Sequence, residues 1–328
     1  MGIKNLNRFI LENCKKNTII KKPLKIFTNK TVVIDTSIYM YKFVAQNALI
    51  ENFYFMLILF KENKITPLFI FDGKPPPEKR ELLRERSDLK RDAELKYNEL
   101  KLELESADVP NELKNELALE MDCLKKQFVR IKWSDINLVK SLITSFGASY
   151  YEAPGEADRM CVEMVLNGEA WACLSDDMDM FVYGCPRVLR HLSLMNSTVL
   201  YYDLDKILAE LNMSMTTFRQ IMVVSGTDYN LSNTPNNIHN TRSLHETMQW
   251  FHEYLKNPYI TSSVNFYDWL NANTKYITDY AELLRVYNMF CITPNDPTNQ
   301  SFQPYLTSGN LNMDKLNGIL AEDGFIFA

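Results

Sequence analysis

Several kinds of sequence feature are missing from this chain. No stretch of its 328 residues reaches the roughly 18 uninterrupted apolar residues that a membrane-spanning helix needs. Residues 1–11 lack the apolar centre of a secretory signal, and position 6 carries Leu where N-myristoylation would want Ser or Thr. We therefore expect a soluble intracellular protein without a lipid anchor.

Paired cysteines and an excess of basic residues are also absent. The six cysteines show no C-x-x-C spacing, so reduced core thiols are expected rather than a disulfide framework or a zinc site. The net charge of −5 argues at face value against a nucleic-acid binder, because such proteins usually carry a basic footprint. What the chain does have is a hydrophobic fraction of 46%, which is enough for a sizeable core.

Short apolar runs alternate with helical patterns in the first part of the chain. Four runs have the length and the β-branched and aromatic content of buried strands, at residues 31–34, 67–71, 148–151 and 170–174. Between them, helical patterns cover residues 39–61, 135–146 and 156–166. This alternation predicts an α/β fold with a central, mostly parallel twisted sheet and helices on both faces.

Two further regions have a different pattern. Residues 79–132 form a charged, glycine-free helical stretch that breaks near Pro110, which suggests a solvated excursion from the α/β body. From Asp203 onward the pattern is of short helices, interrupted by a polar, turn-rich break at residues 231–241 and a proline-rich loop at residues 293–304. The sequence shows no internal repeat and no low-complexity tail.

Acidic residues stand at the ends of the predicted strands. Asp35 and Asp72 each end an apolar run, and Asp177 and Asp179 follow a third. In open α/β sheets, ligands bind in the crevice beyond the carboxyl ends of parallel strands. Three parallel strands that end on acids would therefore place these carboxylates together.

A helix start contributes two more acids. Glu156 and Asp158 fall in the first turn after the Pro-Gly of “EAPGEAD”, where a single carboxylate would usually be a cap that favours the helix dipole. Gathered at one sheet edge, however, these carboxylates would repel one another unless a cation held them. Oxygen ligands without a His or Cys cluster select Mg²⁺ or Mn²⁺, and two such ions about 4 Å apart serve phosphodiester hydrolysis. The pattern therefore predicts a nuclease or a phosphatase.

The chain resembles the flap endonuclease family, the structure-specific 5′ nucleases of the XPG/Rad2 superfamily. The blocks that carry the resemblance occur in the family's order from residue 1 to about residue 230: “MGIKNL”, “VVIDTSIYMYKF”, “FIFDGKPPPEKRELLRERS”, “YYEAPGEAD”, “LSDDMDMFVYG”, “LRHL” and “VSGTDYN”. The resemblance implies a PIN-like nuclease fold that binds two Mg²⁺ ions, which Mn²⁺ could replace. The acids that it implies as metal ligands are Asp35, Asp72, Glu156, Asp158, Asp177, Asp179 and Asp228. Asp176 is then an extra acid, for which we expect a capping or solvated role.

The resemblance also implies that residues 79–132 are a helical arch, although the charge pattern alone would favour a solvated helix. Lys79 and Arg86 lie seven residues apart, on one helix face, and would act as catalytic residues by neutralising the scissile phosphate. Asp179 would be a third catalytic residue, through the metal site. Tyr41 would stack on a base next to the cut. The predicted DNA contacts are Gly2, Lys4, Tyr41, Arg84, Lys90, Arg130, Lys132 and Arg242.

The sequence departs from the family pattern in three places. “NIHNTRS” puts Asn237 and His239 where the family's helix-hairpin-helix has glycines, so a cation-dependent grip on duplex DNA is not expected. The segment between Asp35 and Asp72 is shorter than in cellular relatives, which argues against a strict preference for double flaps. No sliding-clamp peptide is evident near the end of the chain. These losses would suit a compact member encoded by a large DNA virus.

We expect residues 1–328 to form one nuclease domain. Its parts are an N-terminal nuclease region at 1–107, the helical arch at 79–132, an internal nuclease region at 133–230, and a helical region at 231–328 with a degenerate helix-hairpin-helix.

The predicted function is metal-dependent hydrolysis of phosphodiester bonds in 5′-flap or related branched or nicked DNA, during replication, repair or recombination. Setting the seven acids aside, the net charge of −5 becomes +2, so the remaining surface need not repel DNA. The alternatives are a 5′ exonuclease, a Holliday-junction cutter and a catalytically silent factor that binds branched DNA. We expect a monomer in the nucleus or, for a viral protein, in the host cytoplasm.

Overall fold

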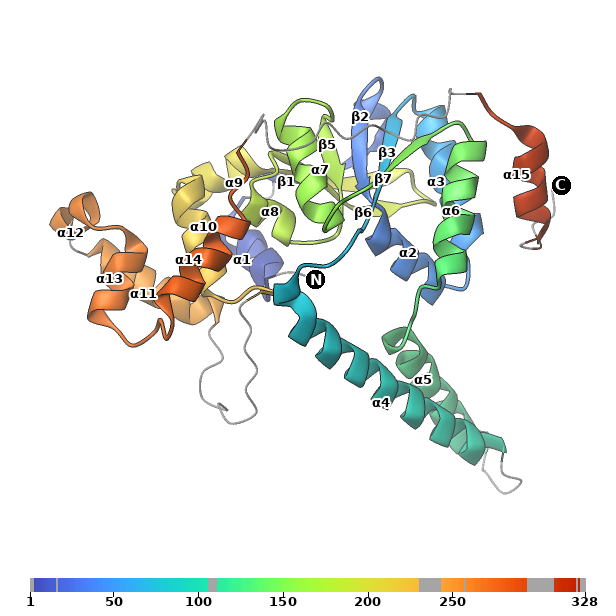
Figure 1. Cartoon of the computed structure of the whole chain (residues 1–328), viewed down its shortest axis with the longest axis horizontal. Coiled ribbons are helices and arrows are strands. Elements are labelled where there is room, and N and C mark those ends of the chain that lie inside the picture. Colours follow the sequence, from blue (N-terminus) through green and yellow to red (C-terminus); the bar gives the residue numbers. More distant parts are fainter. Residues whose placement is uncertain are drawn as a thin grey trace.

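A seven-stranded sheet lies at the centre of the computed structural model, which describes residues 3–15, 17–105, 111–229, 243–256, 258–293, 310–322 and 324 (Figure 1). Its order is β1-β7-β6-β5-β2-β3-β4. Strands β6, β5, β2, β3 and β4 are parallel, whereas β7 pairs antiparallel with both β6 and β1. The strands are β1 (Ile19–Pro23), β2 (Thr31–Asp35), β3 (Thr66–Phe71), β4 (Ser149–Glu152), β5 (Ala172–Leu174), β6 (Arg187–Ser193) and β7 (Thr198–Asp203). The predicted α/β class with a mostly parallel sheet is confirmed.

Helices occupy most of the remaining described residues. Outside residues 79–132, the helices up to Val224 are α1 (Leu6–Asn13), α2 (Thr36–Ala45), α3 (Leu49–Glu62), α6 (Trp133–Ser145), α7 (Ala157–Leu166), α8 (Asp179–Tyr183), α9 (Leu204–Leu211) and α10 (Met215–Val224), with a short 3₁₀ helix, η1 (Leu24–Phe27). The C-terminal helices are α11 (Leu244–Leu255), α12 (Pro258–Ser263), α13 (Phe266–Asn273), α14 (Tyr280–Met289) and α15 (Met313–Glu322). The short helices expected after Asp203 are therefore present.

Helices cover both faces of the sheet. Successive residues of its central strands point to opposite sides, so each strand contributes to the apolar clusters on both faces. On β2, Val33 packs into an apolar cluster with Met160 of α7, whereas Val32 and Ile34 pack into a second cluster with Phe53 of α3. A strand buried on both faces needs an uninterrupted apolar run, which is what residues 32–34 provide. The sequence pattern and the packing thus agree on this strand.

Two predictions about elements were wrong. Residues 39–61 were expected to be one helix, but α2 and α3 are separated by a turn in which Asn47 adopts a left-handed φ of 52°. Strands β1, β6 and β7 were not predicted, and Arg190 explains why β6 was missed. This charged residue is only 5% exposed within β6, because its guanidinium donates to Asn7 Oδ1 and to the carbonyl of Asp176. A tertiary contact thus allows a charge inside a buried strand.

The helical arch is a pair of antiparallel helices, as predicted for residues 79–132. A 3₁₀ turn, η2 (Pro77–Lys79), leads into α4 (Arg80–Glu105), and α5 (Asn111–Gln127) returns beside it, so that the pair projects away from the sheet (Figure 1). Lys96 of α4 pairs with Glu120 of α5 at 2.6 Å, and Arg130 pairs with Glu94 at 2.8 Å. The predicted break near Pro110 lies outside the described residues.

Some predicted features fall where the structure gives no description. Gly2, Asn237, His239 and Arg242 all lie outside the described residues. The degenerate helix-hairpin-helix therefore stays a prediction, as does the division of the chain into regions.

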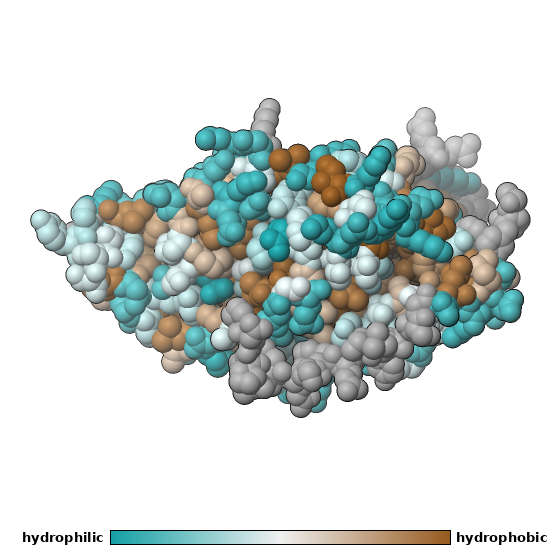
Figure 2. All heavy atoms as spheres, turned by 90° about the horizontal axis from the view of Figure 1, so that it is seen from above, coloured by the Kyte–Doolittle hydropathy of each residue, from teal (hydrophilic) through white to brown (hydrophobic). Residues whose placement is uncertain are grey.

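Among the described residues, no helix combines the length and the hydrophobicity that crossing a membrane requires. On the face seen from above, hydrophobic residues stand among hydrophilic ones (Figure 2).

Candidate functional site

The predicted strand-end acids meet at one edge of the sheet. Asp35 is the last residue of β2, Asp72 directly follows β3, and Asp177 and Asp179 follow β5. Because β5, β2 and β3 are adjacent and parallel, their carboxyl ends lie side by side. The arrangement expected from the sequence is present, whereas the role of each acid as a metal ligand stays a prediction.

Hydrogen bonds hold these carboxylates in place. Asp35 Oδ2 accepts from Ser175 Oγ at 2.9 Å, and Asp177 Oδ1 accepts from the backbone N–H of Asp179 at 2.9 Å. Asp179 Oδ1 in turn accepts from the backbone N–H of Ile3 at 3.2 Å. The N-terminal segment is thereby tied directly to the acidic cluster.

The start of α7 joins the same cluster. Glu156 is the N-cap residue of α7, Asp158 lies in its first turn, and Asp72 Oδ1 accepts from the backbone N–H of Ala157 at 2.8 Å. Asp72 therefore satisfies one of the free N–H groups at the helix start, which fixes β3 and α7 relative to each other.

Gly73 makes this close approach possible. Its N–H donates to the carbonyl of Gly155 at 2.7 Å, and a Cβ built at Gly73 would lie 1.9 Å from the carbonyl oxygen of Ala153. The turn after β3 can therefore reach the turn before α7 only while residue 73 has no side chain.

We expect Gly73→Ala to lower the free energy of unfolding by about 1–3 kcal/mol, because the backbone must move apart to admit the methyl group. Gly155→Ala is the matched control, since nothing lies within 4 Å of a Cβ built there. Chemical denaturation of both variants measures the difference. Equal stabilities of the two variants would contradict the assigned close approach.

Several acids of the cluster are buried close to one another, which makes it costly for all of them to be ionised together. Burial, followed by the nearby Asp72, raises the pKa of Asp35 to about 8. Burial also raises the pKa of Asp158, aided by Asp35, although part of that side chain reaches the surface. The pKa of Asp179 is raised by burial and then by Asp177 and Asp228. A bound cation would lower the cost of keeping these groups charged together.

The donor set suits a hard divalent ion. All seven predicted ligands offer carboxylate oxygen, which Mg²⁺ and Mn²⁺ prefer. Within the described part of the chain, however, no three such side chains are already close enough to hold one ion together. Two of the carboxylates instead have basic partners, which an ion would have to compete with.

Those partners are Lys79 and Arg86, at the base of the arch. Lys79 Nζ lies 2.5 Å from Glu156 Oε1, and Arg86 Nη2 lies 2.7 Å from Asp228 Oδ2. Burial by itself lowers the pKa of Lys79, but Glu156 and the neighbouring acids more than offset it, so the pKa is raised and the side chain stays charged. Both cations therefore face the acids, but they do not share one regular helix as expected, because Lys79 ends the 3₁₀ turn η2 and only Arg86 lies on α4.

Further predicted DNA contacts cluster where the arch meets the body. Tyr41 of α2 is 41% exposed, and Lys90 Nζ of α4 lies 4.8 Å from the centre of its ring. Lys90 also donates to the carbonyl of Val129 at 2.9 Å. Burial, and then the neighbouring Arg130 and Arg86, lowers the pKa of Lys90. A positive, partly aromatic surface thus lies beside the acids.

The remaining predicted contacts that lie within the described residues are exposed. Arg84 lies on α4, Arg130 follows α5, Lys132 is the N-cap residue of α6, and Lys4 precedes α1. None of these positions is contradicted, and their roles stay predictions.

Two residues of the site were missed by the reading of the sequence. Ser175 supports Asp35, and Tyr229 donates through its hydroxyl to Glu156 Oε2. Each stands beside an acid in the sequence, in “LSDD” and “GTDY”, and this adjacency was the one feature that could have pointed to them. The extra acid Asp176 does not cap a helix: its Oδ1 accepts from the backbone N–H of His191 in β6 at 2.6 Å.

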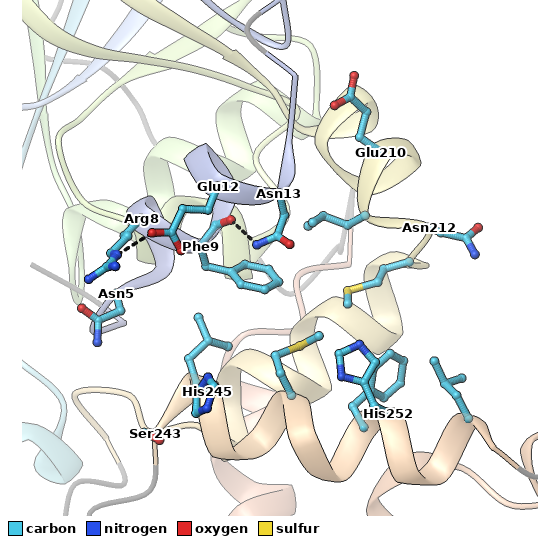
Figure 3. A pocket seen from close by; sticks show the side chains of 16 residues that line it. Asn5, Arg8, Phe9, Glu12, Asn13, Glu210, Asn212, Ser243, His245 and His252 are labelled. Carbon is cyan, nitrogen blue, oxygen red and sulfur yellow. Dashed lines mark hydrogen bonds and ion pairs between the residues drawn. The ribbon is translucent and has the colours of Figure 1, made fainter.

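A hollow of about 640 Å³ lies away from the acids, between α1, the end of α9 and α11. Phe9, Met213, Met248 and Phe251 contribute apolar surface, and His245 and His252 stand on the α11 side (Figure 3). None of the seven acids lines it. The hollow and the acidic cluster are therefore separate features.

Comparison with known proteins agrees with this arrangement. Family models match the XPG N-terminal domain at residues 1–93 and the XPG I-region at residues 147–228, together more than half of the chain. Flap endonuclease 1 of Methanococcus aeolicus is 29% identical over 236 residues, which cover 66% of this chain and 68% of that protein. Flap endonuclease 1-A of Sorghum bicolor is 29% identical over 248 residues, which cover 70% of this chain and 62% of that protein. The chain thus spans roughly two thirds of the length of these relatives.

Solved structures share the fold. The catalytic core of Rad2 in complex with a DNA substrate is 19% identical, with a TM-score of 0.62 and coverage of 98% of this chain and 95% of that one. The Holliday junction-resolving enzyme GEN1, in complex with product DNA and a Mg²⁺ ion, is 18% identical, with a TM-score of 0.56 and coverage of 98% and 72%.

Proposed function

Because the chain belongs to the XPG/Rad2 flap endonuclease family, we propose that it is a structure-specific 5′ nuclease that acts on branched DNA. The observation that supports this most strongly is the opposition of charge at one site. Carboxylates from β2, β3, β5 and α7 gather at the sheet edge, and Lys79 and Arg86 face them from the base of the arch. Metal-dependent hydrolysis of a phosphodiester uses both kinds of group: acids that bind the cations, and fixed positive charges that stabilise the phosphate.

The finer assignment follows the family resemblance. Asp35, Asp72, Glu156 and Asp158 would hold one Mg²⁺ ion, and Asp177, Asp179 and Asp228 a second or shared one, with Mn²⁺ able to substitute. Bound there, the ions would supply an activated water and stabilise the leaving oxygen.

Lys79 and Arg86 would exchange their carboxylate partners for the scissile phosphate and stabilise its developing charge. Tyr41 would stack on the neighbouring base. Cleavage would leave a 5′ phosphate and a 3′ hydroxyl.

The test uses end-labelled 5′-flap, nicked, gapped and four-way-junction DNA with the purified protein, in Mg²⁺ and in EDTA. Metal-dependent cutting near the flap junction is the expected result. Faster cutting of the four-way junction would favour a junction resolvase, which the structural similarity to GEN1 makes the second candidate. Binding of every substrate without cutting of any would replace the enzyme with a branched-DNA binding factor.

We further propose that the protein acts inside the cell. It would cut flaps as a monomer, and it would not be recruited through a sliding-clamp peptide. Gel filtration of the protein with flap DNA, and a binding assay against a sliding clamp, test these two points.

The carboxyl pKa values predict how Mg²⁺ affects stability. A folded-state pKa raised above the unfolded value of about 3.9 means that the folded protein holds the proton more tightly. These groups therefore favour folding at low pH, and that contribution is lost as the pH rises through the folded pKa, which for Asp35 is about 8. Metal binding opposes the loss because it needs the carboxylates ionised.

We expect saturating Mg²⁺ to raise the melting temperature more at about pH 8 than at about pH 5.5. Thermal melts with and without the ion at both values measure the effect. A shift of the same size at both would mean that these carboxyls do not bind the ion.

A further inference from the structure

Tyr229 makes contact with both members of the ion pair at the base of the arch. Its hydroxyl donates to Glu156 Oε2, while Lys79 Nζ binds the other oxygen of the same carboxylate at 2.5 Å. The ring of Tyr229 also faces the ammonium group, with Lys79 Nζ 4.8 Å from the ring centre. Lys79, Glu156 and Tyr229 therefore form a closed triangle of contacts.

Two aromatic residues fix the Tyr229 ring, which is only 8% exposed. Phe290, the C-cap residue of α14, packs edge-on against it with ring centres 5.4 Å apart. Tyr183 of α8 packs on Phe290 at 4.7 Å, and its hydroxyl lies 3.1 Å from that of Tyr229. The ring thus has little freedom to turn away from Lys79.

Helix α14 also supports the residue before Lys79. Arg285 Nη1 lies 2.5 Å from Glu78 Oε1, and the same guanidinium binds Glu282 on its own helix. One C-terminal helix therefore contacts the arch base twice, through Phe290 and Tyr229 and through Arg285 and Glu78.

We propose that Tyr229 is a positioning residue that holds the Lys79 ammonium over the site when Glu156 turns to a metal ion. This inference rests on the proposed function. A lysine side chain has four rotatable bonds, and it would lose its position once its carboxylate partner was taken. The face of an aromatic ring attracts an ammonium without using its N–H groups. Lys79 can then donate those N–H groups to a phosphate while the ring keeps the ammonium in place.

The experiment measures single-turnover cleavage rates and DNA dissociation constants for variants of the full chain. Tyr229→Phe keeps the ring and removes the hydroxyl, so we expect a rate about tenfold lower. Tyr229→Leu removes the ring as well, so we expect a further loss of about tenfold. DNA affinity should stay within about twofold in both, since Tyr229 acts on the ammonium rather than on the bulk of the DNA.

The decisive comparison adds Lys79→Ala. If Tyr229 acts through Lys79, Tyr229→Leu costs little more once Lys79 is gone, whereas a merely structural effect would multiply with that of Lys79→Ala. Tyr267→Phe is the matched control, because it removes a hydroxyl from another buried tyrosine, 1% exposed, which donates to the carbonyl of Gln220 at 2.9 Å, outside the site. Its rate should match that of the unaltered protein.

The outcomes separate the two proposals. An unaltered protein that cuts no substrate would refute the proposed function. An active protein in which Tyr229→Phe and Tyr229→Leu cleave at the unaltered rate, or in which the effects of Tyr229→Leu and Lys79→Ala multiply, would overturn the role of Tyr229 alone.

Discussion

Asp179→Ala is expected to lower the rate of DNA cleavage by about a thousandfold or more, because ion-dependent stabilisation of a phosphoryl transition state amounts to several kcal/mol. Asp179 is 2% exposed and lies at the start of α8, where Ile3 and Asp177 fix its position. Its carboxylate is surrounded by other acids, so removing it also relieves repulsion. DNA binding should change little, because Asp179 is not one of the predicted DNA contacts and is almost fully buried.

Asp176→Asn is the control for this experiment. Asp176 neighbours the same acids in sequence, but its Oδ1 accepts from the backbone N–H of His191, which an amide oxygen can also do. Cleavage rates, DNA dissociation constants and melting temperatures of the two variants separate chemistry from folding. Cleavage that survived in Asp179→Ala would contradict the metal assignment.

Lys79→Ala and Arg86→Ala are expected to lower the cleavage rate by about a hundredfold or more each, since each removes a preorganised positive group from the phosphate site. Lys79 is the more buried of the two, with a side chain 9% exposed against 39% for Arg86. Its electrostatic effect is therefore less screened by water, and Lys79→Ala should cost more.

Arg91→Ala is the matched control for both Lys79→Ala and Arg86→Ala. Arg91 is also on α4, but its side chain is 63% exposed and pairs with Asp88 on its own helix. It should cleave at nearly the unaltered rate, although its loss weakens any general attraction of DNA to the arch. Rates measured at saturating DNA distinguish the two effects. A loss of rate in Arg91→Ala as large as in Lys79→Ala would mean that only the net charge of the arch matters.

Much of the fold could be predicted because its signals are local. Residues 32–34 and 67–71 are apolar throughout, as strands covered on both faces must be, and each run is followed by an acid at the same edge of the sheet. The charged segment 79–132 was predicted to leave the body because it offers no broad apolar face to bury. Strand β6 was missed because Arg190 interrupts its pattern, and the charge is tolerated only through distant partners.

The candidate residues for binding ions and phosphate could be named from the sequence alone, because the acids, Lys79 and Arg86 stand in short sequence blocks with a recognisable pattern. Only the tertiary structure decided their pairing. Lys79 and Glu156 are 77 positions apart in the chain, Arg86 and Asp228 are 142 apart, and Ile3 and Asp179 are 176 apart. Contacts over such separations depend on how the sheet orders its strands, and no local pattern carries that information. The role inferred for Tyr229 exists only at this level, because it depends on a helix from the far end of the chain.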